Sequence, residues 1–144
     1  MKTKFFLPLL LLCLGISSCD KEGEEIDDWP PMKWKTVPEI RLSDEILYYA
    51  VGIPAEGAEY TFTCTNYRLT KVAVLDENNS VFKEITYEHP YFENDWISIT
   101  EENGNSIKIV ARPNPTANSH KLFIEASGGN VSTHFLLIQE AGEQ

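Results

Sequence analysis

The stretch Trp96-Ile97-Ser98-Ile99-Thr100-Glu101-Glu102-Asn103-Gly104-Asn105-Ser106-Ile107-Lys108-Ile109 decides the fold class, because it encodes a β-hairpin by itself. Isoleucines alternate with polar residues on both sides of the Asn-Gly pair, so each set falls on one face of a pleated strand. Asn and Gly tolerate the positive φ angles that a tight turn requires. The pattern predicts two antiparallel strands over Trp96–Thr100 and Ser106–Arg112, each with one buried face.

Outward from this hairpin, short runs of β-forming residues alternate with turn residues, and no stretch shows a sustained helical period. The other predicted strands are Ile46–Val51, Ala58–Thr65, Thr70–Leu75, Val81–Tyr87, Lys121–Ala126 and Thr133–Gln139. Their number and spacing predict an all-β fold, namely an immunoglobulin-like two-sheet sandwich of seven or eight strands, over residues 43–144.

The first 18 residues have the three parts of an export signal peptide. Lys2 and Lys4 supply positive charge, residues 5–16 are apolar, and Ser17-Ser18 precedes Cys19. The apolar run has 12 residues, whereas a membrane-spanning helix needs about 20. The segment 16–19 resembles a lipobox, in which the cysteine becomes the lipid-bearing first residue of the mature protein. The alternative is an ordinary secretory signal that happens to precede a cysteine.

Residues 19–42 are predicted to form a flexible, acidic tether, because like charges extend a chain that has few apolar residues. Acyl chains on Cys19 would hold the protein on a membrane, since two or more chains anchor stably. The expected location is the cell envelope, at the outer membrane. The acidic stretch after Cys19 is either a surface-export signal or a plain spacer. Trp29 and Trp34 are expected to pack on the domain edge or in the lipid interface.

The charge balance excludes several classes of partner. The chain has 12 basic and 22 acidic residues, and loss of Lys2 and Lys4 with the signal leaves a net charge of −12. Nucleic-acid binding and docking on anionic lipid both need clustered basic residues. Cys64 is then the one unmodified cysteine, and its strand context predicts a buried apolar role rather than a reactive thiol. No cofactor or metal is expected from the spacing of Cys and His.

The second half of the chain has segments in a recognisable order: Trp96-Ile97-Ser98-Ile99, Gly104, Ile107–Ala111, Asn114, His120–Ile124 and Leu137–Gly142. This order resembles that of a BACON domain, a Bacteroidetes-associated, often N-terminal module named for carbohydrate binding. The resemblance covers residues 45–142 and implies an immunoglobulin-like sandwich in a cell-envelope protein. The family usually has a Trp shortly after the Asn of its second strand, whereas this chain has Tyr67-Arg68-Leu69 there. His120 stands at a position where Arg is common in the family.

The segment Tyr87-Glu88-His89-Pro90-Tyr91-Phe92-Glu93-Asn94-Asp95-Trp96 crowds four aromatic rings among acids and an amide. Aromatic faces beside hydrogen-bonding groups are what a sugar site needs. Tyr87, His89, Tyr91 and Phe92 are therefore the candidate ligand-binding residues. In the alternative, Tyr87, Phe92 and Trp96 pack in the core.

Three weaker candidates accompany this segment. Asp76–Asn79 offers oxygen ligands to Ca²⁺ but lacks the regular spacing of a dedicated loop. Glu101-Glu102 is interpreted as part of a solvated turn. His120 and His134 could pair across neighbouring strands, although strand histidines are more often edge or packing residues.

None of the common catalytic motifs occurs in the sequence, so the protein is not expected to be an enzyme. The leading hypothesis is a lipid-anchored cell-envelope protein with a non-catalytic module that binds glycan or protein at the cell surface. The alternative is a structural spacer or accessory protein that binds another envelope protein through a sheet edge or through the segment that contains Trp29 and Trp34.

Overall fold

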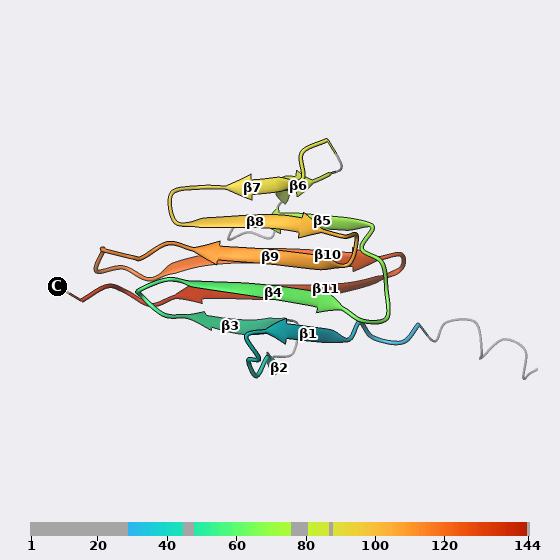
Figure 1. Cartoon of the computed structure of the whole chain (residues 1–144), viewed down its shortest axis with the longest axis horizontal. Coiled ribbons are helices and arrows are strands. Elements are labelled where there is room, and N and C mark those ends of the chain that lie inside the picture. Colours follow the sequence, from blue (N-terminus) through green and yellow to red (C-terminus); the bar gives the residue numbers. More distant parts are fainter. Residues whose placement is uncertain (1–28, 45–47, 76–80, 87, 144) are drawn as a thin grey trace, which may run out of the picture. The chain divides into compact units, whose positions relative to one another are not determined.

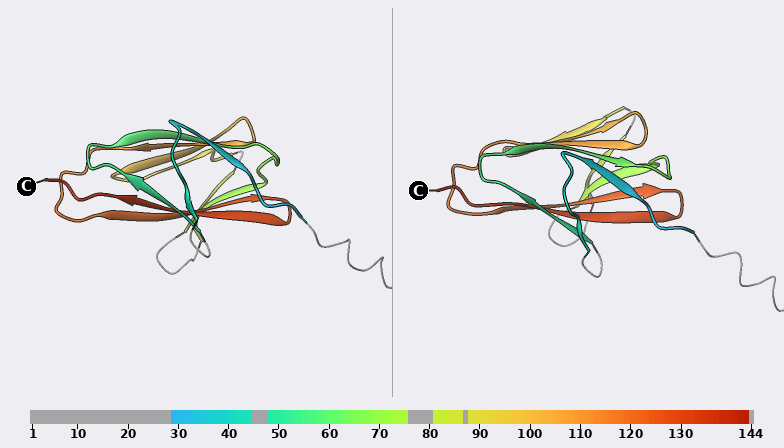
Figure 2. Two further views of the ribbon diagram at one scale, coloured as in Figure 1. Left: turned by 90° about the horizontal axis from the view of Figure 1, so that it is seen from below. Right: turned by 60° about the horizontal axis from the view of Figure 1, so that its bottom comes forward.

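The computed structural model describes residues 29–44, 48–75, 81–86 and 88–143. Eleven strands among these residues form two sheets, and none of the described residues is helical (Figure 1). All the strands belong to one compact unit that begins at Pro31. The predicted all-β, immunoglobulin-like sandwich is confirmed, and Figure 2 shows its two layers from the side.

The first layer is a fully antiparallel five-stranded sheet. Its strands are, in spatial order, β1 (Trp34–Val37), β4 (Ala58–Cys64), β9 (Ser106–Ala111), β8 (Ile97–Glu102) and β7 (Tyr91–Glu93). Alternation along β8 and β9 buries Ile97, Ile99, Ile107 and Ile109 completely, so these four side chains face the second layer.

The second layer is a six-stranded sheet. Its strands are, in spatial order, β2 (Ser43–Asp44), β3 (Tyr49–Ile53), β11 (Val131–Gln139), β10 (His120–Gly128), β5 (Lys71–Leu75) and β6 (Val81–Ile85). Every pair is antiparallel except β3 and β11, which run parallel. The nine-residue strands β10 and β11 form the longest hairpin, and their inward residues include Ile124, Phe135 and Leu137.

Aromatic contacts join the two layers. Phe62 of β4 and Phe135 of β11 have ring centroids 5.2 Å apart, and both side chains are fully buried. Trp34 of β1 packs edge-on against Phe135 at 5.0 Å. Its indole N–H donates to the hydroxyl of Thr133. Trp34 therefore belongs to the sandwich, as one of the two predicted alternatives had it.

The turn at Asn103-Gly104 has the geometry that the sequence predicts. Asn103 and Gly104 both adopt positive φ angles, 58° and 75°, between β8 and β9. Cys64 is also where the sequence placed it, since its side chain is buried at the end of β4.

The predicted boundary of the tether at residue 42 is wrong. β1 pairs with β4 from Trp34 to Val37, and Met32 is buried in the core. Two prolines before β1 and Pro38 after it give the segment the composition of a linker. Nevertheless, Trp34 and Thr36 alternate inward with Lys35 and Val37 outward, as in a strand. The acidic run before Trp29 lies outside the described residues.

The other differences concern short strands. β2 has two residues and β7 has three, so neither shows enough alternation to be recognised in the sequence. With β1 they raise the count to eleven, above the seven or eight predicted. The predicted strand Ile46–Val51 corresponds to β3, which spans Tyr49–Ile53 and so ends two residues later than predicted. Residues 45–47 lie outside the described part.

Candidate functional site

The predicted ligand residues separate when the chain folds. Tyr91 begins β7, and 58% of its surface is exposed. His89 lies exposed in the preceding turn, where its backbone exchanges hydrogen bonds with that of Thr86. Tyr87 lies outside the described residues. Of the four, the structure places Tyr91 and His89 at the surface.

Phe92 is mostly buried, as the alternative interpretation had it, although it also lines a hollow beside Tyr91. Its side chain is only 6% exposed and joins the hydrophobic core. The reason is the strand: successive side chains of β7 point to opposite faces, so an exposed Tyr91 requires an inward Phe92. Trp96, which the alternative interpretation placed in the core, packs partly against that core and against the ring of His120.

Tyr91 ends a row of side chains that crosses the outer face of the five-stranded sheet. Tyr91 pairs with Thr100 of β8, and Thr100 pairs with Lys108 of β9. Lys108 then pairs with Thr61 of β4, and Thr61 with Val37 of β1. Four strand spacings of about 4.8 Å make this outer row roughly 19 Å long. Its two ends, Tyr91 and Val37, are large exposed apolar side chains.

A shallow hollow of about 410 Å³ lies beside Tyr91. Its polar lining comes from Lys83, His89 and Glu93. The Glu93 carboxylate is fixed by an ion pair with Arg112, whose guanidinium also donates to the Asn94 carbonyl. The hollow therefore combines one exposed aromatic ring with hydrogen-bonding groups of both signs.

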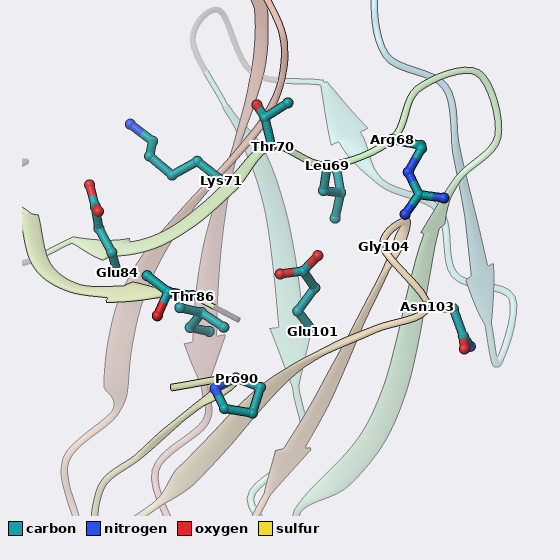
Figure 3. Close-up of a pocket in the computed structure, with 11 residues that line it drawn as sticks. Arg68, Leu69, Thr70, Lys71, Glu84, Thr86, Pro90, Glu101, Asn103 and Gly104 are labelled. Atoms are coloured by element: carbon teal, nitrogen blue, oxygen red, sulfur yellow. The ribbon is translucent and has the colours of Figure 1, made fainter. Parts of the chain in front are cut away.

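A larger cleft, the charged cleft, opens at one end of the sandwich between the two sheets (Figure 3). Its volume is about 800 Å³. Side chains from four segments line it: Arg68, Leu69, Thr70, Lys71, Glu84, Ile85, Thr86, Pro90, Glu101, Asn103 and Gly104. Figure 3 shows Glu101 projecting from β8 into the opening, with Arg68 and Glu84 on opposite sides.

The sequence interpretation missed the charged cleft. The sequence predicts Glu101 in a solvated turn, yet it continues the inward series Ile97, Ile99, Glu101 on β8. Strand alternation extended by one step would have placed its carboxylate between the sheets. Arg68 has no comparable signal, because only the folded topology brings it beside Gly104.

A third polar cluster lies on the outer face of the six-stranded sheet. Glu125 of β10 accepts from Lys71 Nζ at 2.7 Å and contacts His134 Nε2 at 2.9 Å. The hydrogen bond and charge of Lys71 lower the pKa of Glu125, although partial burial opposes this shift, and His134 lowers it further. His134 contacts Glu125 and His120 contacts Gln139, so of the two alternatives the structure favours strand histidines that pack against their neighbours over a histidine pair.

The Glu125 cluster predicts a pH dependence of stability. A carboxyl group whose pKa is lower in the folded protein stabilises it above the unfolded value, here 4.5. That contribution disappears as pH falls through the folded pKa. Urea unfolding at pH 7 and in steps below pH 4.5 should therefore show a smaller acid-induced loss of stability for Glu125→Gln than for wild type. Glu56→Gln, at an exposed turn, is the matched control and should behave like wild type.

No group of three side chains suited to hold a metal ion occurs in the described part of the chain. Asp76–Asn79, the Ca²⁺ candidate in the sequence, lies outside the described residues. Over the same described ranges, no helix has the length and apolar character needed to cross a bilayer.

Neither a protein-family model nor a curated protein matches the chain. Among solved structures, the NMR structure of a protein from Bacteroides thetaiotaomicron is similar, with a TM-score of 0.59 and 22% identity, over 83% of this chain and 96% of that one. This similarity concerns the fold alone. Two further structures are similar with lower TM-scores: the Dpr1 IG1–DIP-eta IG1 complex and a chimeric titin Z1Z2.

The Dpr1 IG1 complex has a TM-score of 0.39 at 12% identity, over 71% of this chain and 94% of that chain. The titin Z1Z2 chimera has a TM-score of 0.37 at 14% identity, over 65% of this chain and 87% of that chain. The strand topology itself defines the class: the chain contains an immunoglobulin-like β-sandwich.

Proposed function

We propose that this protein is a lipid-anchored cell-envelope protein whose β-sandwich is a non-catalytic, carbohydrate-binding module. One structural observation carries the binding part: Tyr91 is exposed at the end of the outer row, beside a hollow lined by Lys83, His89 and Glu93. An aromatic ring packs on the C–H face of a sugar, while adjacent polar groups bind its hydroxyls.

The outer row favours an extended ligand. From Tyr91 it continues through Thr100, Lys108 and Thr61, which offer two hydroxyls and an ammonium group across three further strands. The Lys108 ammonium is held near the sheet by Glu59 at 3.1 Å. A polysaccharide chain lying across the strands would meet a hydrogen-bonding group at each of them.

The anchor is proposed from the sequence of the first 28 residues. The lipobox-like segment 16–19 supports lipidation of Cys19, and the acidic residues that follow support a spacer that holds the domain away from the outer membrane. The resemblance of residues 45–142 to a BACON domain supports the same envelope setting. The alternative, a structural spacer or an accessory protein that binds another envelope protein, shares this anchor but has no glycan ligand.

Lipidation has a direct test in cells. Cys19→Ala should abolish labelling by a palmitate analogue and move the protein from the membrane fraction to the soluble envelope fraction, because acyl chains supply the membrane affinity. Cys64→Ala is the matched control, since the Cys64 side chain is buried in the domain. Membrane retention of the Cys19→Ala protein would contradict the proposed anchor.

Tyr91→Ala tests the glycan site. The full chain, purified in detergent, is titrated calorimetrically against a panel of plant and host polysaccharides. Loss of the Tyr91 ring should weaken binding about tenfold, equivalent to ~1.4 kcal/mol, near the upper end of one aromatic contact. Trp29→Ala, which removes an exposed aromatic ring outside the sandwich unit, should leave binding unchanged. Absence of binding to every polysaccharide would favour the spacer alternative.

A further inference from the structure

The charged cleft lies apart from the outer row, and its lining includes two basic residues, Arg68 and Lys71, and two acidic residues, Glu84 and Glu101. Its floor is apolar, because Leu69 and Ile85 are both buried. Glu101 enters it from β8, and Arg68 lies at its rim beside the β8–β9 turn (Figure 3). The cleft volume of about 800 Å³ is within the range of 300–1,000 Å³ that is typical of small-ligand sites.

The Glu101 carboxylate has no bonded partner among the described residues. It points inward, since Ile97 and Ile99 on the same face of β8 are fully buried, and its register partner is the buried Ile107. Neither an ion pair nor a side-chain hydrogen bond joins it to any residue in the described part. Burying a carboxylate without a hydrogen-bond donor is unfavourable, so a ligand that supplies such a donor is favoured at Glu101.

The guanidinium of Arg68 also has no bonded partner among the described residues. It lies against the backbone of Gly104, where a Cβ atom would come within 2.5 Å of one of its nitrogens. It pairs with neither Glu101 nor another carboxylate of the described ranges. The nearby Lys71 ammonium is already bonded to Glu125 on the outer face, so it does not compensate Glu101.

We propose that the charged cleft binds a short zwitterionic peptide, with Glu101 holding its ammonium group and Arg68 its carboxylate. A ligand with both charges gives each side chain a charged partner, whereas a neutral or singly charged ligand leaves at least one of them without such a partner. Charge-assisted hydrogen bonds are the strong ones, and a guanidinium binds a carboxylate with two parallel bonds. The apolar floor of Leu69 and Ile85 suits a small side chain between the two termini.

The test uses the ¹⁵N-labelled full chain and three probes: the dipeptide Ala-Ala, its N-acetyl form and its C-terminal amide. Saturable shifts of the Arg68, Glu101 and Gly104 amide signals are expected with Ala-Ala. Each capped probe should bind at least about tenfold more weakly, because it lacks one charge. Glu101→Gln should weaken Ala-Ala binding to a similar extent, and so should Arg68→Gln.

Two matched controls separate local contact from general charge effects. Glu102→Gln changes the next residue on β8, which points to the opposite face, and Lys121→Gln removes an exposed cation on β10. Both variants should bind Ala-Ala like wild type. The proposal would be overturned by equal binding of capped and uncapped probes, by no saturable shift at these residues, or by a neutral oligosaccharide that produces the same shifts. The glycan proposal is independent, because Tyr91 does not line this cleft.

Discussion

Replacing Phe135 by alanine is expected to lower the free energy of unfolding by about 3–5 kcal/mol, the usual cost of deleting a buried phenylalanine ring. Phe135 is fully buried, and its ring contacts Phe62 across the interface between the sheets. The rings of Trp34 and Tyr49 pack against it at 5.0 and 5.8 Å. The truncation therefore removes contacts from three other strands at once.

Urea denaturation followed by tryptophan fluorescence measures this loss. Phe135→Leu is the matched control, because it keeps most of the apolar volume and should cost clearly less than the alanine variant. Trp34 reports directly on the site, since its indole packs on the Phe135 ring. An alanine variant as stable as wild type would show that Phe135 does not join the two layers.

Asn114→Asp is expected to destabilise the protein by about 2–4 kcal/mol, although the two side chains have nearly the same shape. The Asn114 amide nitrogen donates to the carbonyls of Asn118 and Glu140, at 2.8 and 3.0 Å. Its oxygen accepts from the backbone and hydroxyl of Thr116. An aspartate would place a buried oxygen against two carbonyl oxygens and lose both donated bonds.

The matched control is Asn118→Asp, since Asn118 is exposed and contributes only backbone atoms to this network. It should change the urea midpoint little. Because Asn114 ties the β9–β10 connection to the residue after β11, the Asn114→Asp protein should also show faster amide exchange at Gly142, which donates to Thr116. Equal stability of the two variants would contradict a structural role for Asn114.

The sequence predicted the parts of the fold that depend on local pattern. The β8–β9 hairpin followed from alternating isoleucines around Asn103-Gly104, and both turn residues have the positive φ angles expected. The burial of Cys64 followed from its place in an apolar strand. These features are local, because a strand of six or seven residues carries its own period.

The edges of the sheets could not be predicted in the same way. β1, β2 and β7 have four residues or fewer, and their pairing depends on partners far along the chain. Trp34 pairs with Cys64, thirty residues later, so a segment with the composition of a tether became part of the core. Composition alone does not report such contacts.

The candidate sites show the same difference between features set by local sequence and features set by contacts between distant residues. Tyr91 is exposed and Phe92 is buried because they are successive residues of the three-residue strand β7, which is too short to be recognised in the sequence. The charged cleft needs β5, β6 and β8 to be brought together from different sheets. No spacing in the sequence encodes that arrangement, so Arg68 and Glu101 could be paired as candidates only after folding.

The central proposal is a glycan-binding surface on the outer face of the five-stranded sheet, and a residue-resolved titration tests it most directly. The ¹⁵N-labelled full chain is titrated with an oligosaccharide derived from the tightest-binding polysaccharide of the panel. Saturable shifts should concentrate on the outer row, at Tyr91, Thr100, Lys108 and Thr61, and should weaken in Tyr91→Ala. Shifts confined to other surfaces, or an affinity that the Tyr91→Ala variant retains in full, would contradict the proposal.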